Sequence, residues 1–210
     1  MSDGLAELRS TGLPVINLPV TNAPPAERGD AARNRALLLD AARRLIGQRG
    51  ADAVTMDDIA VEAGVGKGTL FRRFGSRSGL MLVLLDEDEQ VLQQAYMFGP
   101  PPLGPGAPPL QRLFAYGRTR LQFVWNHRAL LSDAGRDPQN RFSAPTAVQR
   151  THIRILLRSA STTGNLDAQI DALLALLEAD YVIHQHDDLG HNLDAQAEAW
   201  ESLARKLCGT

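Results

Sequence analysis

Apolar side chains recur every three or four positions along most of this chain, which is the spacing of one face of an α-helix. The first such stripe consists of Leu38, Ala42, Leu45 and Ile46. A second consists of Leu166, Ile170, Leu173, Leu174, Leu177 and Tyr181, and a third of Leu193, Ala197, Trp200, Leu203 and Leu207. Stretches in which β-branched residues alternate with polar ones are scarce, so we predict an all-α fold.

Two segments rich in proline and glycine interrupt this pattern. Residues 1–29 contain four prolines and three glycines, and they predict a mobile N-terminal arm. Residues 99–109 read GPPPLGPGAPP, and their prolines prevent a helix from continuing. From residue 77 onward, we expect helices over residues 77–98, 110–133, 145–161, 166–187 and 192–207.

The stretch AGVGKGTLFRRFG at residues 63–75 has two interpretations, and both involve phosphate. A nucleotide-binding P-loop follows a buried strand and places a glycine five residues before Gly-Lys-Ser/Thr. Here Val61 occupies the position of that glycine, and Gly68 occupies the position of the hydroxyl residue. The preceding residues, MDDIAVEA, predict a helix instead of a strand, so the P-loop interpretation fails on all three counts.

The other interpretation is a pair of short helices joined by a glycine turn. Thr55 and Asp58 have the spacing of a capping box, which would begin a helix over residues 56–63. Gly64 suits the left-handed residue that ends a helix, and a second helix then covers residues 67–74. This arrangement is typical of a helix-turn-helix unit.

The second of these helices has the chemistry of a DNA contact. Leu70 and Phe74, four residues apart, would bury one side of it. The basic residues Lys67, Arg72 and Arg73 are left to point elsewhere. Unpaired N–H groups at a helix N-terminus attract phosphate, and arginine forks onto phosphate or guanine. The alternative is a surface helical hairpin whose arginines are simply solvated.

The charge balance excludes a protein that is basic throughout, although it is compatible with a local DNA contact. The 210 residues have a net charge of −2. Residues 1–80 carry 11 Lys and Arg against 9 Asp and Glu, and residues 81–210 carry 11 against 15.

Cys208 is the single cysteine, which leaves no internal disulfide. With no membrane-spanning run and no signal peptide, we expect a soluble, cytoplasmic protein without membrane contact.

Residues 35–80, RALLLDAARRLIGQRGADAVTMDDIAVEAGVGKGTLFRRFGSRSGL, resemble the DNA-binding domain of the TetR (tetracycline repressor) family. The segments LLDAARRLIGQRG, VTMDDIAVEAGV, KGTLFRRF and SRSGL occur in the family's order and without gaps. The resemblance implies an all-α homodimer in which residues 30–80 are the helix-turn-helix domain. Residues 81–210 would then bind an effector and dimerise. It also implies a repressor that a small molecule releases from a palindromic operator in double-stranded DNA.

The resemblance further implies DNA-binding roles for eight residues. They are Thr55, Lys67, Gly68, Thr69, Phe71, Arg72, Arg73 and Arg77. Arg72 matches a groove-facing position that reads bases, whereas Thr55 and Arg77 match contacts to the DNA backbone. Phe71 stands where relatives usually have tyrosine, so the phosphate contact of that hydroxyl is absent here.

For the rest of the chain, the resemblance implies functions without identifying residues. The helix over residues 77–98, which turns acidic at residues 86–89, would be a lever between the two domains, or else a plain core helix. Aromatic candidates for an apolar effector pocket are Phe114, Tyr116, Phe123, Trp125, Phe142 and Tyr181, each of which is otherwise an ordinary core residue. Candidates for the dimer interface are Leu173, Leu177, Trp200 and Leu203, each of which is otherwise buried within its own subunit.

The segment HQHDDLGH at residues 184–191 contains side chains that ligate metals. However, His184 and His186 are two apart on an expected helix and therefore point to different sides. We expect no metal, no cofactor and no enzymatic activity. Two alternatives to an operator-binding regulator stay open: a ligand sensor that acts through protein partners, and a metal-dependent enzyme that uses this segment.

Overall fold

The computed structural model describes residues 29–134 and 144–209, and all regular structure within them is α-helical, as predicted. The N-terminal helices are α1 (Gly29–Arg49), α2 (Met56–Ala63), α3 (Lys67–Phe74) and α4 (Arg77–Phe98). The C-terminal helices are α5 (Pro109–Asn126), α6 (Arg128–Ala134), α7 (Ala144–Ser159), α8 (Leu166–Ala175), α9 (Ala179–Asp187) and α10 (Leu193–Leu207). The predicted mobile arm lies outside the described residues except for Gly29, which begins α1.

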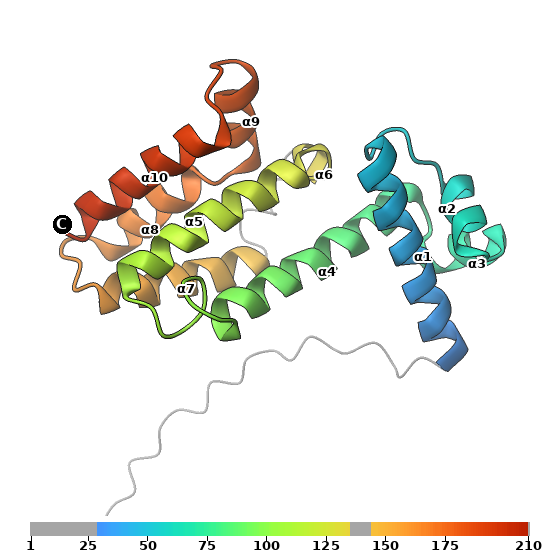
Figure 1. Cartoon of the computed structure of the whole chain (residues 1–210), viewed down its shortest axis with the longest axis horizontal. Helices are drawn as coiled ribbons and strands as arrows, with labels where there is room; N and C mark the ends of the chain where they lie inside the picture. The colour runs from blue at the N-terminus through green and yellow to red at the C-terminus, as the bar shows by residue number, and fades with distance from the viewer. Residues whose placement is uncertain (1–28, 135–143, 210) are drawn as a thin grey trace, which may run out of the picture.

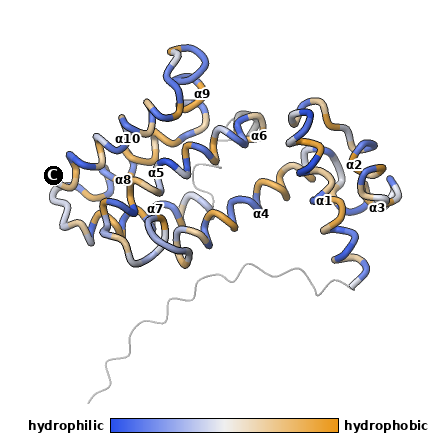
Figure 2. The backbone as a smooth tube through the Cα atoms, in the orientation of Figure 1, coloured by the Kyte–Doolittle hydropathy of each residue, from blue (hydrophilic) through white to orange (hydrophobic). Residues whose placement is uncertain are grey.

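Helix α4 connects two groups of helices (Figure 1). Helices α1, α2 and α3 gather at one end of the molecule, and α5 to α10 gather at the other. Short hydrophobic and hydrophilic stretches alternate along the helices, as expected of helices with one apolar face (Figure 2). Within residues 29–134 and 144–209, no helix combines the length and the apolar character that crossing a membrane requires.

Each group of helices has its own hydrophobic core. The N-terminal core joins α1 to the short α2 and α3 through Leu38, Ile59 and Leu70, each of which is fully buried. This core also includes Leu84 of α4, whereas Leu92 of the same helix belongs to the C-terminal core. Helix α4 is therefore shared by both cores, and the predicted domain boundary at residue 80 stays a prediction.

The C-terminal core contains a close contact between α5 and α10. Trp200 of α10 is buried, and its indole N–H donates to the carbonyl oxygen of Leu173 at 2.9 Å. A Cβ atom added at Gly117 of α5 would lie 2.4 Å from the Trp200 ring. The absence of a side chain at Gly117 therefore allows the two helices to approach this closely.

The predicted bounds of the two short helices and of the fourth helix agree with α2, α3 and α4. In contrast, the single helix expected over residues 110–133 is divided at His127. The imidazole Nδ1 of His127 bonds to the carbonyl oxygen of Phe123 at 2.8 Å, and Nε2 lies 2.9 Å from the carboxylate of Asp88 on α4. The backbone of His127 has a φ of −107° and a ψ of 13°, which ends α5, and the two contacts of the ring fix this residue between α5 and α6.

The single helix expected over residues 166–187 is also divided, between α8 and α9. Both α8 and α9 contact α10, but α8 otherwise packs on α7, whereas α9 packs on α5 and α6, so one straight helix would not reach all of these neighbours. The predicted apolar stripe therefore does not continue on one face. Leu177 is buried in the turn, but Tyr181 is 39% exposed.

Most of the residues predicted to form the dimer interface are buried within one subunit, so the prediction is wrong for them. Leu173, Leu177 and Trp200 are at most 4% exposed and belong to the core of their own subunit. They present no surface to a partner, and the alternative that the sequence left open applies to them. Leu203 is half-buried and stays a candidate for the interface.

We expect Gly117→Ala to destabilise the protein by about 1–3 kcal/mol, because the added methyl group must displace the Trp200 ring in a close-packed core. Gly47→Ala is the matched control, since Gly47 lies in α1 with no atom within 4 Å of an added Cβ. There alanine should increase stability by about 0.5–1 kcal/mol. Urea unfolding measures both changes, and wild-type stability of Gly117→Ala would contradict the close α5–α10 contact.

Candidate nucleic-acid interface

Local hydrogen bonds fix the two ends of α2. Thr55 Oγ1 accepts a hydrogen bond from the Asp58 N–H at 3.1 Å, and the Asp58 carboxylate accepts one from the Thr55 N–H at 3.0 Å, which completes the predicted capping box. The hydroxyl of Thr55 also donates to that carboxylate at 2.6 Å, and these bonds from Thr55 lower the pKa of Asp58. At the other end, Gly64 has a φ of 64°, and its N–H points to the carbonyls of Ala60 and Val61.

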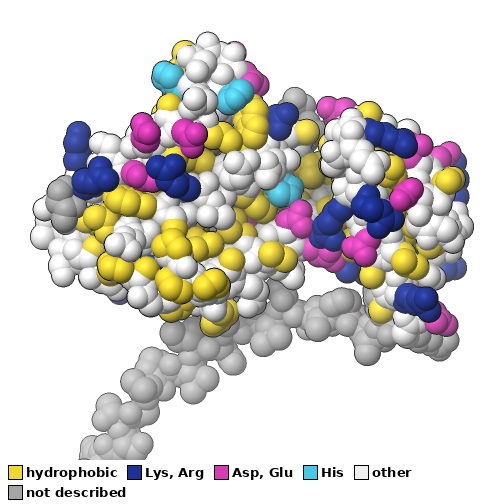
Figure 3. Space-filling model, in the orientation of Figure 1, with side chains coloured by type: hydrophobic (Ala, Val, Ile, Leu, Met, Phe, Trp, Pro, Cys, Tyr) yellow, Lys and Arg dark blue, Asp and Glu magenta, His cyan; other side chains and the backbone are white. Residues whose placement is uncertain are grey.

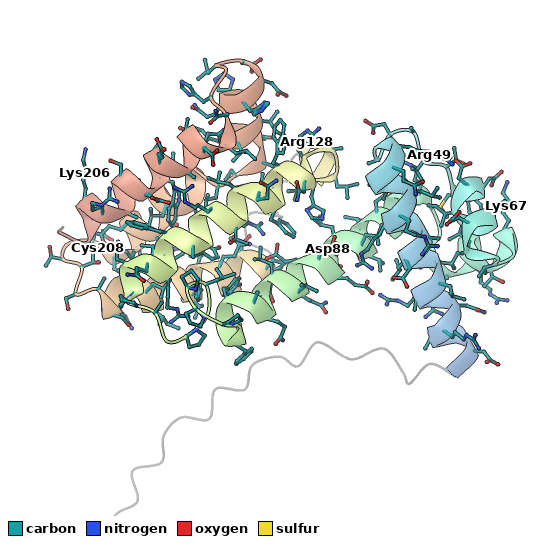
Figure 4. All side chains as sticks on the ribbon, in the orientation of Figure 1. Arg49, Lys67, Asp88, Arg128, Lys206 and Cys208 are labelled. Atoms are coloured by element: carbon teal, nitrogen blue, oxygen red, sulfur yellow. The ribbon has the colours of Figure 1, made fainter. Side chains whose placement is uncertain are left out.

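Helix α3 rests on the core with one side and exposes the other. Leu70 and Phe74 form the buried side. The exposed residues are Lys67, Gly68, Phe71 and Arg72, which share one face of a helix. Thr69 and Arg73 are half-buried beside them. Lys67 lies at the outer end of the molecule, away from the C-terminal helices (Figure 4).

The Lys67 side chain is held by a weak ion pair. Its Nζ lies 2.7 Å from the carboxylate of Asp57 on α2, and both side chains are about 60% exposed. An exposed pair of this kind contributes at most about 1 kcal/mol, so a phosphate group can replace Asp57 at little cost. Lys67 also lies 6.0 Å from the centre of the Phe71 ring, which is 39% exposed and offers an apolar surface.

Two residues predicted to contact the DNA backbone are engaged within the protein. Arg77 Nε donates to the carbonyl oxygen of Val54 at 2.9 Å, and a terminal nitrogen of Arg77 donates to that of Ala51. The side chain thus ties the start of α4 to the loop between α1 and α2. The hydroxyl proton of Thr55 is donated to Asp58. The phosphate contacts of Arg77 and Thr55 stay predictions, but each residue also holds the domain together.

Arginines of α1 are balanced by acidic residues of α2. Arg44 pairs with Glu62 at 3.1 Å, and Arg49 pairs with Asp58 at 3.9 Å. Basic and acidic side chains accordingly lie interspersed over the N-terminal helices (Figure 3). Within the part of the chain that the structure describes, Arg72 forms no such ion pair. Arg72 therefore gives the exposed side of α3 a positive charge that no acidic side chain among the described residues pairs with.

The aromatic residues predicted to line an effector pocket do not meet in one place. Phe114 lies against Arg205 of α10, Phe123 against His127, and Trp125 against His186 of α9. Tyr181 is exposed, and Phe142 lies outside the described residues. These contacts are spread along the length of α5, so the predicted pocket is not formed by this set.

A group of polar residues that the sequence did not predict as a site lies instead between α4, α5 and α7. We call it the buried seam, and it comprises Glu89 and Tyr96 of α4, Arg112, Tyr116 and Arg120 of α5, and Gln149 and His152 of α7. The Glu89 carboxylate accepts hydrogen bonds from Arg120 and, at 3.3 Å, from Gln149. The spacing of four between Arg112, Tyr116 and Arg120 was a sequence signal for one polar face of α5, although only Tyr116 was expected near a ligand.

Acidic residues of α4 also bind α1. Arg35 and Arg43 of α1 pair with Glu87 at 2.5 and 2.9 Å, and Arg43 pairs with Asp88 at 3.0 Å. The other carboxylate oxygen of Asp88 lies 2.9 Å from His127, at the corner between α5 and α6. Figure 4 shows Asp88 where α4 passes between the two groups of helices. Asp88 therefore links α1 directly to the C-terminal helices.

The histidines of residues 184–191 bond to separate partners. The Nδ1 atom of His184 lies 2.7 Å from Asp188, that of His186 lies 2.8 Å from Asp187, and that of His191 lies 2.8 Å from Gln185. In the described ranges, no group of three or more His, Cys, Asp or Glu side chains is placed to hold a metal ion. The ring nitrogens of this segment thus stabilise the end of α9 and do not face one point.

The N-terminal helices of this chain are similar in sequence to a family of bacterial regulators. Residues 38–84 match the model of the family of bacterial regulatory proteins named tetR. A helix-turn-helix transcriptional regulator of Staphylococcus aureus (strain bovine RF122 / ET3-1) is 36% identical over 61 residues, which are 29% of this chain and 33% of that protein. The chain thus matches about a third of the length of such curated relatives.

Solved structures extend the similarity to nearly the whole fold. A TetR-like transcriptional regulator from Rhodococcus sp. RHA1 is 26% identical, with a TM-score of 0.56 over 84% of this chain and 97% of that one. A TetR-family regulator from Pectobacterium atrosepticum has a TM-score of 0.66 at 20% identity, over 87% and 97% of the two chains. A protein from Saccharomonospora viridis, solved in complex with choline, has a TM-score of 0.63 at 19% identity, over 81% and 95%.

We expect Arg77→Ala to destabilise the N-terminal helices by about 1–3 kcal/mol, because two carbonyl oxygens lose their charged donor. Arg77→Lys should restore only part of this stability, since lysine lacks the planar fork that reaches both carbonyls. Ser78→Ala, at the next and exposed position of α4, is the control. Urea unfolding measures the effect, and Arg77→Ala with wild-type stability would restrict Arg77 to a DNA contact.

Proposed function

This chain belongs to the TetR family of bacterial regulatory proteins, and we propose that it binds operator DNA as a homodimer and regulates transcription in response to a small molecule. The observation that carries this proposal is the exposed side of α3. Phe71 and Arg72 project from a helix whose opposite side is anchored in the core by Leu70. We further propose that this regulator performs no catalytic step and acts in the cytoplasm.

The proposed reading of DNA follows from the size and charge of α3. A short basic helix fits the major groove of DNA, where arginine forks onto the O6 and N7 atoms of guanine. Arg72 is the residue that we assign to base reading. Lys67, Gly68 and Thr69 in the first turn of α3 would bind phosphate together with the backbone N–H groups, and Arg73 would contact the DNA backbone.

The proposed homodimer places two copies of α3 in successive major grooves of a palindromic operator, about 34 Å apart. We assign the pairing surface to Leu203 and to the outer faces of α8 and α10. The exposed residues of these faces include Ala168, Ala172 and Ala175 on α8, and Ala195, Ala199 and Ser202 on α10. Small side chains allow helices of two subunits to pack closely in a bundle.

The proposed control by a small molecule uses α4 as the lever. Leu84 of α4 is buried with the DNA-binding helices, and Leu92 is buried with the C-terminal helices. A ligand that displaces α4 in the C-terminal core would therefore change the separation of the two α3 helices. The similar fold that was solved with choline supports a small-molecule ligand for this architecture. If the ligand binds the DNA-free form more tightly, it releases the operator, and the protein is a repressor.

Selection from a random DNA pool should recover a palindromic site. Arg72→Ala should bind that site about 10- to 100-fold more weakly, because a bidentate base contact contributes about 1–3 kcal/mol. The affinity of the variant for random DNA should fall much less. Gel shifts over a series of salt concentrations measure both affinities.

Arg158→Ala, which changes an exposed arginine of α7, is the matched control and should bind DNA like the wild type. Equal losses by Arg72→Ala on the selected site and on random DNA would show that Arg72 contacts phosphate only. A pool from which no sequence is recovered would contradict the proposed function and favour a sensor that acts through protein partners.

A further inference from the structure

Three aromatic rings from three helices meet at the centre of the buried seam. Tyr96 of α4, Tyr116 of α5 and His152 of α7 have ring centroids 4.4–5.4 Å apart. Both tyrosines are 0% exposed, and His152 is 6% exposed. The three rings therefore form one contact in the interior of the C-terminal core.

The polar atoms of these rings are buried without partners. Within the described ranges, the hydroxyl oxygens of Tyr96 and Tyr116 and the Nε2 atom of His152 have no hydrogen-bond partner. Buried polar groups are nearly always hydrogen-bonded, because leaving them unpaired destabilises the folded state. Phenylalanine would fill both tyrosine positions without burying a hydroxyl. Three such atoms on three rings that contact one another point to a bound molecule that completes their hydrogen bonds.

The charge around the three rings is unevenly compensated. Arg120 is paired with Glu89, whereas Arg112 forms no ion pair with any described residue. A terminal nitrogen of Arg112 donates to the carbonyl oxygen of Tyr96 at 3.1 Å, and the Nε atom of Arg112 is buried without a partner. Burial, and secondarily the charge of Arg112, lowers the pKa of His152 to about 4, so the imidazole is neutral at neutral pH. Arg112 itself is half-buried, and it gives the seam one positive charge without a counter-ion among the described residues.

We propose that Arg112, Tyr96, Tyr116 and His152 bind a small organic carboxylate. The guanidinium group and the two phenol hydroxyls supply donors for the carboxylate oxygens, and the imidazole supplies a further donor or acceptor. The aromatic rings and the surrounding apolar core accommodate an apolar body. An organic cation fits less well, because both oxygens of Glu89 already accept hydrogen bonds, from Arg120 and from Gln149.

The position of the seam gives this ligand a consequence for α4. The polar atoms of the three contacting rings are buried, so a ligand that bonds to them must displace side chains around it. In this proposal the ligand separates Tyr96 of α4 from α5 and α7. This step rests on the proposed function, in which displacement of α4 releases operator DNA. Binding of the carboxylate itself does not depend on DNA and is tested without it.

The first test measures the stability of the full-length protein without ligand. Tyr96→Phe and Tyr116→Phe should each raise the melting temperature by about 2–6 °C, because each removes an unpaired buried hydroxyl. Tyr181→Phe, at an exposed position on α9, should leave it unchanged. A lower melting temperature for both seam variants would show that the hydroxyls have structural partners, and it would overturn the proposal.

The second test measures ligand binding by the shift of the melting temperature. The probes are acetate, hexanoate, benzoate and phenylacetate, each compared with its primary amide, and benzylamine as a cation. At least one carboxylate should raise the melting temperature by about 2–4 °C at saturation, and its amide should not. Arg112→Gln should abolish the shift, Tyr116→Phe should reduce it, and Tyr181→Phe should retain it.

Three outcomes of this second test would overturn the inference: no shift by any carboxylate, equal shifts by the amides or by benzylamine, or a shift that both Arg112→Gln and Tyr116→Phe retain in full.

Titration of the active carboxylate into the protein–operator complex then separates the carboxylate site from the proposed function. Binding without release of DNA leaves the carboxylate site intact and contradicts the lever mechanism. A protein that selects no operator but binds the carboxylate contradicts the proposed function alone.

Discussion

Helix α4 is buried in two cores at once, and the carboxylates of Glu87, Asp88 and Glu89 hold it between them. Glu87 pairs with α1, Asp88 pairs with α1 and with the α5–α6 corner, and Glu89 bonds to α5 and α7. Since consecutive residues of a helix point about 100° apart, these three side chains reach outward in different directions. Helix α4 therefore neither rotates nor slides without exchange of ion pairs on several sides. The position of α3 relative to the C-terminal helices depends on this arrangement.

These ion pairs differ in strength because they differ in exposure. The side chains of Glu89 and Arg120 are only 8% and 12% exposed, whereas those of Glu87, Asp88 and Arg43 are 27–37% exposed. Separating a buried pair leaves an uncompensated charge in the core, but a half-exposed pair can be replaced by water with a small change in free energy. A displacement of α4 therefore disturbs the pairs of Glu87 and Asp88 more easily than that of Glu89.

The two cores differ in how completely their helix-capping signals and buried polar groups are satisfied. In the N-terminal core, the capping box of Thr55 and Asp58, the left-handed Gly64 and the buried Leu70 all favour the same short helices. The C-terminal core instead contains aromatic rings whose polar atoms have no partner among the described residues. Proteins that depart from such rules usually do so at functional sites. The N-terminal core thus supports α3 through satisfied local contacts, whereas in our proposal a ligand completes the hydrogen bonds of the C-terminal core.

The sequence by itself determined the all-α class and the bounds of α2, α3 and α4, because their signals act between residues three or four positions apart. Only the tertiary structure decided the breaks at His127 and between α8 and α9. At these points the chain contacts helices that are distant in the sequence. It also decided the second role of Arg77, whose acceptors lie 23 and 26 residues earlier in the chain. Likewise, the buried seam joins α4, α5 and α7, and the spacing within each helix did not reveal which polar faces would meet. Local periodicity fixes which side of a helix is buried, but the neighbour that buries it is set by the packing of the whole chain.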